Sequence, residues 1–280
     1  MKIIIHGGFF SESHIDNQTK KAKQDALQEI ARKGFEYLKR HGALETVIYT
    51  VSLLEDDELF NAGIGSQIQS DGKIRMSASV MDGSTLRMSG VINIEEVKNP
   101  VQVAEKLLGF EDKVLSGEGA TSFARKMGFG PFSTETPQRR KEYLDKLKSA
   151  GSGTVGCVVL DGEGRLAAAT STGGKGFEIP CRVSDSATVA GNYANRFCGV
   201  SCTGVGEDIV GGAVAAKIVT RVSDGMPIEK AFERTFEELK EIDGFAGAIG
   251  IDGSGNFCHL DSHPSMVFAS YDGENFVIFD

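Results

Sequence analysis

The sequence predicts an α+β fold in which antiparallel sheets form layers that are covered by helices. Two observations in its 280 residues lead to this fold class. Apolar runs that can pair as hairpins meet at Asp-Gly turns, and these runs gather toward both ends of the chain. The longer helical patterns lie in two groups, one near the N-terminus and one in the C-terminal half.

The N-terminal half opens with an apolar run. Residues 2–6 predict a buried strand that ends in a glycine turn, and apolar residues at helical spacing predict helices over 16–41 and 44–55. The other elements expected here are a glycine-rich loop at 60–65, a hairpin across 70–72 with its second strand over 74–81, an Asp-Gly turn at 82–83, and short helices over 100–108 and 120–126.

A change of character follows in the middle of the chain. Residues 129–153 are polar, contain proline and end in Gly-Ser-Gly, which predicts an exposed linker with a charged, helix-like run over 139–148. Beyond it, strands are expected to pair across Asp-Gly turns at 161–162, 252–253 and 272–273, and helices to cover 208–222 and 227–242. The small residues at 211–213 and 215–216 would let the first of these helices pack close to a sheet.

Composition narrows the function classes. Hydrophobic content of 40% and charged content of 25% are ordinary for a globular protein of one large or two small domains. The net charge of −9 argues against nucleic-acid and anionic-membrane partners, which bind basic surfaces. No apolar stretch reaches the length of a membrane span, and the first residues lack the apolar core of a secretion signal. The five cysteines form no C-x-x-C pair, so we expect a cytoplasmic protein with reduced thiols.

Thr154 occupies the position with the clearest chemical use. It follows Gly-Ser-Gly and opens an apolar strand that ends at Asp161. If the peptide bond before it breaks, this single residue supplies a nucleophilic hydroxyl and a free α-amine to act as its base. For Gly-Thr-Val-Gly alone, an ordinary strand-opening threonine is the favoured interpretation. Residues 151–156 also spell G-x-G-x-x-G, but a dinucleotide site needs a strand before it and a helix after it, which is the reverse of the order here.

Four further stretches combine hydroxyl groups, charge and glycine. Each has an ordinary interpretation when taken singly: Asn61 as an Asx-turn, Thr172 as a strand-edge threonine, Arg182 with Asp185 as a surface ion pair, and Thr203 as a turn residue. The stretches cover 60–63, 170–174, 182–186 and 202–207. Their occurrence together, in this order around Thr154, favours a shared site.

The pattern resembles the plant-type L-asparaginase and isoaspartyl aminopeptidase family of N-terminal nucleophile hydrolases. Sequence segments similar to those of this family occur along nearly the whole chain, at 6–8, 59–66, 80–83, 117–120, 153–156, 170–174, 182–186 and 203–207. The resemblance implies a four-layer αββα sandwich formed by one domain, residues 1–280. It also implies that the chain cuts itself between Gly153 and Thr154, which gives an α subunit of residues 1–153 and a β subunit of residues 154–280.

The same resemblance implies a role for each site residue. Thr154 would be the nucleophile and Thr172 would orient it, while Asn61 would lie nearby from the α subunit. The oxyanion hole would be made by the Thr203 hydroxyl and the Gly204 N–H group. The substrate α-carboxylate would bind Arg182, and its α-ammonium group would bind Asp185 and the Gly206 carbonyl. These roles suit the chemistry, because an α-amine titrates near pKa ~7.7–8.0 and a guanidinium fork matches a carboxylate.

No catalytic cofactor is expected. The family's structural sodium loop, made of main-chain carbonyl groups, would correspond to Leu54, Glu55, Asp57, Phe60, Ala62 and Ile64. The expected substrates are small: L-asparagine or a β-aspartyl dipeptide, from which L-aspartate is released. A dimer of αβ units is implied by the resemblance alone.

Two segments depart from the family's pattern. Phe9 and Phe10 stand where the family has more glycine, and residues 261–266 replace its Asn-Thr/Ser-x-Gly-Met segment, with His263 interpreted as structural. Both segments come near the active site in the family, so we expect large β-aspartyl dipeptides to lose more of their advantage over asparagine than small ones.

Three alternatives stay open. A glycosylasparaginase-like hydrolase is disfavoured by the missing secretion signal. A taspase-like endopeptidase is disfavoured by Asp185, which suits a free α-amino group. A non-processing binding or scaffold protein is disfavoured by the intact threonines, although Phe9 speaks for it.

Overall fold

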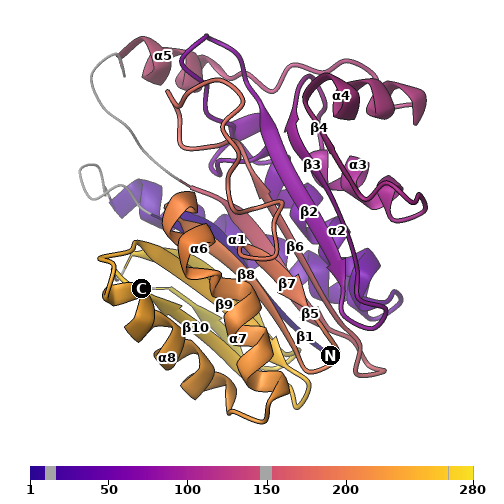
Figure 1. Cartoon of the computed structure of the whole chain (residues 1–280), viewed down its shortest axis with the longest axis vertical. Coiled ribbons are helices and arrows are strands. Elements are labelled where there is room, and N and C mark those ends of the chain that lie inside the picture. Colours follow the sequence, from indigo (N-terminus) through magenta and orange to yellow (C-terminus); the bar gives the residue numbers. More distant parts are fainter. Residues whose placement is uncertain (10–16, 146–152, 264, 280) are drawn as a thin grey trace.

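Two sheets packed face to face form the centre of the molecule (Figure 1). The computed structural model describes residues 1–9, 17–145, 153–263 and 265–279. One sheet has eight strands in the order β12-β11-β1-β5-β6-β2-β3-β4, and the other has four in the order β10-β9-β8-β7. The strands that lie centrally in the large sheet, β1, β5 and β6, contact the small sheet.

The large sheet is antiparallel except where β3 pairs with β4. Its central strands are buried along nearly their whole length, as expected of strands that lie between a second sheet and a helical layer. Its strands are β1 (Lys2–Phe9), β2 (Met76–Asp82), β3 (Arg87–Ile94), β4 (Val114–Ser116), β5 (Val155–Leu160), β6 (Leu166–Thr172), β11 (Met266–Tyr271) and β12 (Phe276–Ile278).

The small sheet is antiparallel throughout. Its strands are β7 (Asn192–Ala194), β8 (Cys198–Gly204), β9 (Ala246–Asp252) and β10 (Phe257–Asp261). Glycines in β8 and β9 allow close approach: a Cβ atom on Gly199 would lie 2.8 Å from the side chain of Val158 in the opposing sheet. The two sheets can therefore pack tightly where β8 crosses β5.

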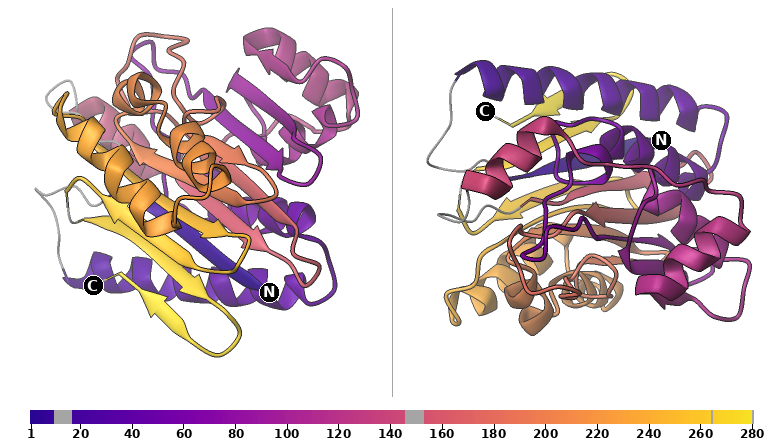
Figure 2. Two further views of the ribbon diagram at one scale, coloured as in Figure 1. Left: turned by 60° about the horizontal axis from the view of Figure 1, so that its bottom comes forward. Right: turned by 90° about the horizontal axis from the view of Figure 1, so that it is seen from above.

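Helices cover both outer faces. On the large sheet lie α1 (Asn17–Leu38), α2 (Ala43–Glu55) and α3 (Pro100–Leu107), and on the small sheet lie α7 (Val214–Ser223) and α8 (Ile228–Lys240). The right-hand view of Figure 2 shows α1 on one outer side and the orange helices on the other, with the sheets between them. The four-layer αββα sandwich is confirmed. The shorter helices are η1 (Gly63–Gly65), α4 (Gly117–Lys126), α5 (Pro137–Asp145) and α6 (Gly206–Gly212).

Apolar side chains form two buried clusters, one for each helical layer. The larger fills the space between the large sheet and α1 to α3, and it continues between the sheets with Ile249 and Ile251 of β9. The smaller lies between the small sheet and the helices α7 and α8, where Phe232 is fully buried. No helix of the described part of the chain has both the length and the apolar character needed to cross a membrane.

Most of the expected elements are present, and the three later Asp-Gly hairpins are confirmed as β5–β6, β9–β10 and β11–β12. The glycine turn expected after residue 6 is wrong. β1 continues to Phe9, with an irregular register against β11 between His6 and Phe9. The strand can continue because Gly7 and Gly8 have no side chains. A Cβ atom on Gly7 would lie 2.5 Å from the Phe60 ring, and Gly8 adopts φ +90°, which favours glycine.

The prediction of one helix over 208–222 is also wrong, because the structure has two helices there, α6 and α7. Ala213 between them has φ +49°, in the left-handed region, and the Ala215 N–H group donates to the Ala190 carbonyl (2.8 Å). That tertiary bond competes with the helical one, and the two preceding glycines weaken the helix.

Smaller differences concern the loops and short strands. The turn at 70–72 exists, but the residues before it form no strand; the Gln69 side chain instead accepts a bond from Arg75 (2.6 Å). The expected linker contains α5, and its residues 146–152 lie outside the described part. The sequence interpretation did not include β3, β4, β7 and β8 as strands.

Candidate active site

Thr154 lies at the start of β5, in the middle of the large sheet. Its side chain is buried, and its hydroxyl donates to the hydroxyl of Thr172, the last residue of β6, at 3.2 Å. The Gly174 N–H group also donates to the Thr172 hydroxyl (3.1 Å), which holds this side chain against the nucleophile candidate. The pairing of β5 with β6 thus brings together two threonines that are 18 positions apart in the sequence.

The carbonyl group of Gly153, directly before Thr154, accepts two hydrogen bonds from side chains. It accepts hydrogen bonds from the Asn61 side-chain amide (2.7 Å) and from the Thr172 hydroxyl (3.2 Å). Asn61 is held in turn, because its Oδ1 atom accepts from the Gln67 N–H group (2.9 Å) and its amide also donates to the Gly174 carbonyl. Two donors therefore polarise the carbonyl of the peptide bond that precedes Thr154.

Thr203 and Gly204 end β8 in the opposing sheet. The Thr203 hydroxyl is fully buried and has no hydrogen-bond partner among the described residues. Buried hydroxyls are normally bonded, so this one is available to a group that enters the site. Gly204 has φ +133°, and a Cβ atom there would lie 2.6 Å from the Phe245 carbonyl, so only glycine fits.

The two expected substrate anchors, Arg182 and Asp185, lie beside the start of α6. A Cβ atom on Gly206 would lie 2.8 Å from the Arg182 guanidinium and 2.9 Å from the Asp185 carboxyl, so these groups gather around one glycine. Arg182 forms a bidentate ion pair with Glu207 (2.6 and 2.8 Å), and this bond lowers the pKa of Glu207 to about 2. Glu207 has no role in the site predicted from the sequence. Its position in the first turn after Gly206 is the signal that could have identified it.

Asp185 has one carboxyl oxygen without a hydrogen-bond partner among the described residues. Its side chain is 2% exposed, and that oxygen is the Oδ2 atom. Burial raises the pKa of this carboxyl to about 7, an effect that the Arg182 charge offsets only in part. A buried carboxyl with one free oxygen suits a cationic ligand group.

The loop expected to hold sodium closes tightly after α2. A Cβ atom on Gly63 would lie 2.1 Å from the Glu55 carbonyl oxygen, and one on Gly65 would lie 1.8 Å from that of Phe60. The carbonyl groups of Glu55 and Phe60 thus face these two glycines. Those of Leu54, Asp57 and Ala62 accept main-chain bonds from Asp57 (3.4 Å), Phe60 (3.2 Å) and Gly65 (3.1 Å). An all-oxygen set of this kind fits a hard cation.

Phe9 packs beside the end of β8 that carries Thr203. Its ring lies 4.6 Å from that of Phe245, and its Cζ atom would be 2.9 Å from a Cβ atom on Gly247, which pairs with Thr203. The exposed His263 also stacks on Phe245, at 4.7 Å. Residues 10 and 264, which belong to the two departures noted in the sequence, lie outside the described residues.

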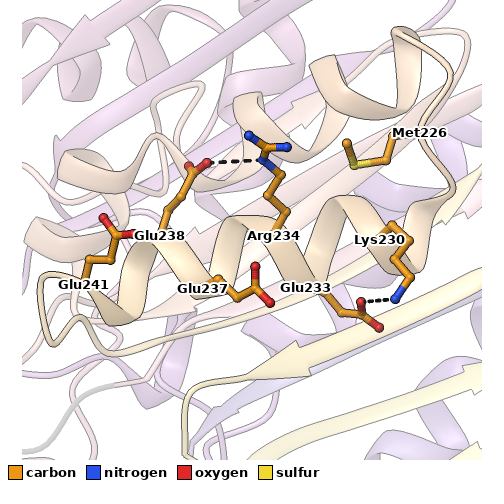
Figure 3. A pocket seen from close by; sticks show the side chains of 7 residues that line it. All are labelled: Met226, Lys230, Glu233, Arg234, Glu237, Glu238 and Glu241. Atoms are coloured by element: carbon orange, nitrogen blue, oxygen red, sulfur yellow. Dashed lines mark hydrogen bonds and ion pairs between the residues drawn. The ribbon is translucent and has the colours of Figure 1, made fainter.

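A surface hollow on α8 is unrelated to this site. It has a volume of about 560 Å³ and is lined by Met226 and by charged side chains of α8, with ion pairs between Lys230 and Glu233 and between Arg234 and Glu238 (Figure 3). None of the threonines discussed above lines it.

The family model and three relatives that match this chain all carry asparaginase names. The family model described as asparaginase matches residues 1–278. An isoaspartyl peptidase/L-asparaginase of Synechocystis sp. is 41% identical, over 97% of this chain and 88% of its own. A plant-type L-asparaginase of Pyrococcus furiosus is 36% identical, over 95% of both chains. A mouse isoaspartyl peptidase/L-asparaginase is 34% identical, over 96% of this chain and 87% of its own.

Proposed function

The chain belongs to the asparaginase family, and from this premise we propose that it is an amidohydrolase activated by cleavage of its own chain before Thr154. The products are residues 1–153 and 154–280, which stay together as one domain. The processed enzyme releases L-aspartate from L-asparagine, from β-aspartyl dipeptides or from both. One observation carries the proposal: the Gly153 carbonyl accepts bonds from Asn61 and Thr172, directly beside the Thr154 hydroxyl.

Self-cleavage uses the groups that surround Gly153. The Thr154 hydroxyl oxygen attacks the Gly153 carbonyl carbon, and the developing oxyanion is stabilised by the two donors already bound to that oxygen. The C–N bond then breaks as the hydroxyl proton passes to the nitrogen, which leaves an ester. Water hydrolyses this ester to a Gly153 carboxylate and a free N-terminal threonine.

Turnover uses the same hydroxyl with a new base. The α-amine of Thr154 accepts the hydroxyl proton as the oxygen attacks the side-chain amide carbon of the substrate. The Thr203 hydroxyl and the Gly204 N–H group stabilise the oxyanion, each donor being worth roughly 3–4 kcal/mol. Ammonia or an amino acid leaves with the proton, and water releases L-aspartate from the acyl-enzyme.

Charged groups select the aspartyl part of the substrate. Arg182 binds the α-carboxylate, while Asp185 and the Gly206 carbonyl bind the α-ammonium group. The unpaired Asp185 oxygen supports this assignment, because a free ammonium group would complete its bonding. The same feature disfavours a taspase-like endopeptidase, whose substrate has no free amine at this position.

Three accompanying expectations remain proposals. Carbonyl groups of Leu54, Glu55, Asp57, Phe60, Ala62 and Ile64 would hold a structural sodium ion, which would brace the loop that carries Asn61. The five cysteines are free thiols, which supports a cytoplasmic location. Assembly as a dimer of αβ units rests on family membership alone.

One incubation experiment tests the proposal. Freshly purified protein is followed on a denaturing gel, and in parallel by release of ammonia from L-asparagine. We expect the 29.9 kDa chain to give two bands of similar size while activity rises in step. A chain that stays whole, or one that splits without gaining activity on asparagine and on β-Asp-Leu, would contradict it.

A further inference from the structure

A buried row of three polar side chains starts at the main chain of Thr154. The Nδ1 atom of His6 lies 3.1 Å from the Thr154 carbonyl oxygen, and its Nε2 atom lies 2.9 Å from the Ser201 hydroxyl. Ser201 is in turn 2.7 Å from the Thr170 hydroxyl. All three side chains are 0% exposed, and they join strands of both sheets behind the nucleophile.

The direction of these bonds is set by the carbonyl group, which can only accept. His6 must therefore carry its proton on Nδ1, so that Nε2 accepts from the Ser201 hydroxyl. Ser201 has then used its only proton, and Thr170 must donate to it. Burial lowers the pKa of His6 to about 3, so the ring is uncharged at neutral pH and does not act as a base there.

The row occupies space that a side chain at position 156 would otherwise fill. A Cβ atom on Gly156 would lie 2.0 Å from the Ser201 oxygen and 2.4 Å from the His6 Nε2 atom. Any other residue at 156 would push the imidazole or the serine away. The glycine two residues after Thr154 is thus needed by His6, which neighbours it across the β1–β5 pairing.

The Thr154 carbonyl needs such a donor because the strand ladder does not reach it. Pairing of β1 with β5 stops at His6 and Gly156, and β1 is irregular at the glycines that follow. Once the bond to Gly153 is cut, Thr154 becomes a free chain end, which would fray without a further bond. The His6 side chain supplies this bond in place of the ladder.

We propose that His6, oriented by Ser201 and Thr170, is a positioning residue that fixes the Thr154 carbonyl and thereby the α-amine and hydroxyl of the nucleophile. This inference rests on the proposed function. It assigns His6 no contact with the substrate, so its removal should lower kcat and leave KM nearly unchanged.

Two substitutions of His6 separate positioning from packing. In His6→Asn the amide nitrogen takes the place of Nδ1 and can still donate to Thr154, whereas in His6→Gln it moves outward to Ser201. We expect kcat of the processed Gln variant to fall about a hundredfold, and that of the Asn variant by much less, because a small misplacement of reacting groups is costly. Equal kcat values for the two variants, or a loss seen mainly in KM, would overturn the proposal.

Ser201→Ala, with Ser89→Ala as its control, tests the second bond of the row. Ser89 is equally buried and donates one bond to the Ala104 carbonyl (2.6 Å), far from Thr154 along the sheet. Ser201→Ala should lower kcat about tenfold, as expected for a positioned group that loses its orienting bond, while Ser89→Ala should not. Similar kcat values for the two would mean that Ser201 only packs.

The tautomer of His6 can be measured in a variant that does not turn over substrate. In ¹⁵N-histidine-labelled Thr154→Ala protein, the His6 signals are identified by their loss in the double variant with His6→Asn. We expect a protonated Nδ1, an unprotonated Nε2 and no titration between pH 5 and 9. A proton on Nε2 would overturn the proposal. An inactive wild type with the expected tautomer would instead count against the proposed function.

Discussion

The site has two halves that are built in different ways. Around Gly153, the groups that surround the peptide bond are uncharged, and Thr172 and Asn61 are fully hydrogen-bonded in the uncut chain. Around Gly206, the groups are charged or unpaired: Asp185 has an oxygen without a partner, and nearby the Thr203 hydroxyl has none.

In the proposed function, this difference separates the groups that cleave the chain itself from the groups that bind the substrate. The first half already holds its reactant, the Gly153 carbonyl, so its donors are satisfied before any reaction. The second half has buried polar atoms that become satisfied only when a ligand arrives, and such atoms cost stability in the empty protein. Substitutions in the two halves should therefore have different consequences, which can be ranked by size.

The largest effect is expected in the first half. Thr154→Ala removes the proposed nucleophile of both reactions, so the protein should remain a single 29.9 kDa chain without activity on asparagine. Thr154→Ser keeps a hydroxyl and should still cleave. N-terminal sequencing of the smaller wild-type fragment should read Thr-Val-Gly, and any other start would mean that a different bond is cut.

The next effect belongs to the second half alone. Arg182→Ala removes the guanidinium fork and leaves Glu207 without its partner, so kcat/KM should fall at least about a hundredfold, as for a charge-assisted bond worth about 3 kcal/mol. Self-cleavage should change little, since Arg182 makes no contact with Gly153. Arg182→Lys serves as the matched control, because it keeps the positive charge without the guanidinium fork. Its kcat/KM should lie between those of the wild type and Arg182→Ala. A slowed cleavage reaction would show that the halves are coupled.

A third prediction concerns how much the buried, unpaired Asp185 carboxyl lowers the free energy of unfolding. Burial raises the pKa of Asp185 from 3.8 to about 7, so between these values the folded chain keeps a proton that the unfolded chain has lost. Stability of the protein with Asp185 therefore falls as pH rises through this window, relative to Asp185→Asn, and stays low above it. In the uncut Thr154→Ala background, the Asn variant should gain up to about 4 kcal/mol of unfolding free energy at pH 8, and almost nothing at pH 4.

Urea unfolding of both chains at several pH values checks this result. The other titrating groups are common to the two chains, so their contributions cancel in the difference. A gain that is equal at pH 4 and pH 8 would show that Asp185 is not protonated on folding.

Most helices and hairpins of the fold could be predicted from the sequence, because their sequence signals are local. The Asp-Gly hairpins and the amphipathic patterns of α1, α2 and α8 identify themselves by turn chemistry and spacing. The break between α6 and α7 depends instead on a bond from Ala215 to the distant Ala190 carbonyl. No local pattern contains that information.

For the site, motif order was enough to gather the residues but not to give their contacts. Thr154, Thr172, Thr203 and Arg182 come from short motifs that lie in different strands and loops of the fold. That Asn61 and Thr172 share the Gly153 carbonyl, and that Glu207 pairs with Arg182, follows from strand pairing and loop paths. His6 was read as a strand end, because its function depends on Ser201, which is 195 positions away in the chain.

The smallest expected effect concerns the leaving group. Arg182 and Asp185 lie on the β7 side of Thr203, since Asp185 adjoins Gly191 just before β7. The ring of Phe9 lies on the β9 side, over Gly247 and against Phe245. A substrate whose aspartyl part is held by the anchors extends its leaving group away from them, so it approaches the aromatic side.

Phe9→Leu should therefore widen the leaving-group side with little loss of core packing. We expect kcat/KM for β-Asp-Phe to rise a few-fold relative to L-asparagine, with β-Asp-Gly in between, because relief of a steric contact is worth about 1 kcal/mol. The measurement is kcat/KM for all three substrates on processed wild type and variant. Ammonia is too small to meet Phe9, so asparagine serves as the internal reference. A wild-type enzyme that prefers β-Asp-Phe, with ratios unchanged in Phe9→Leu, would mean that the aromatic side faces away from the leaving group.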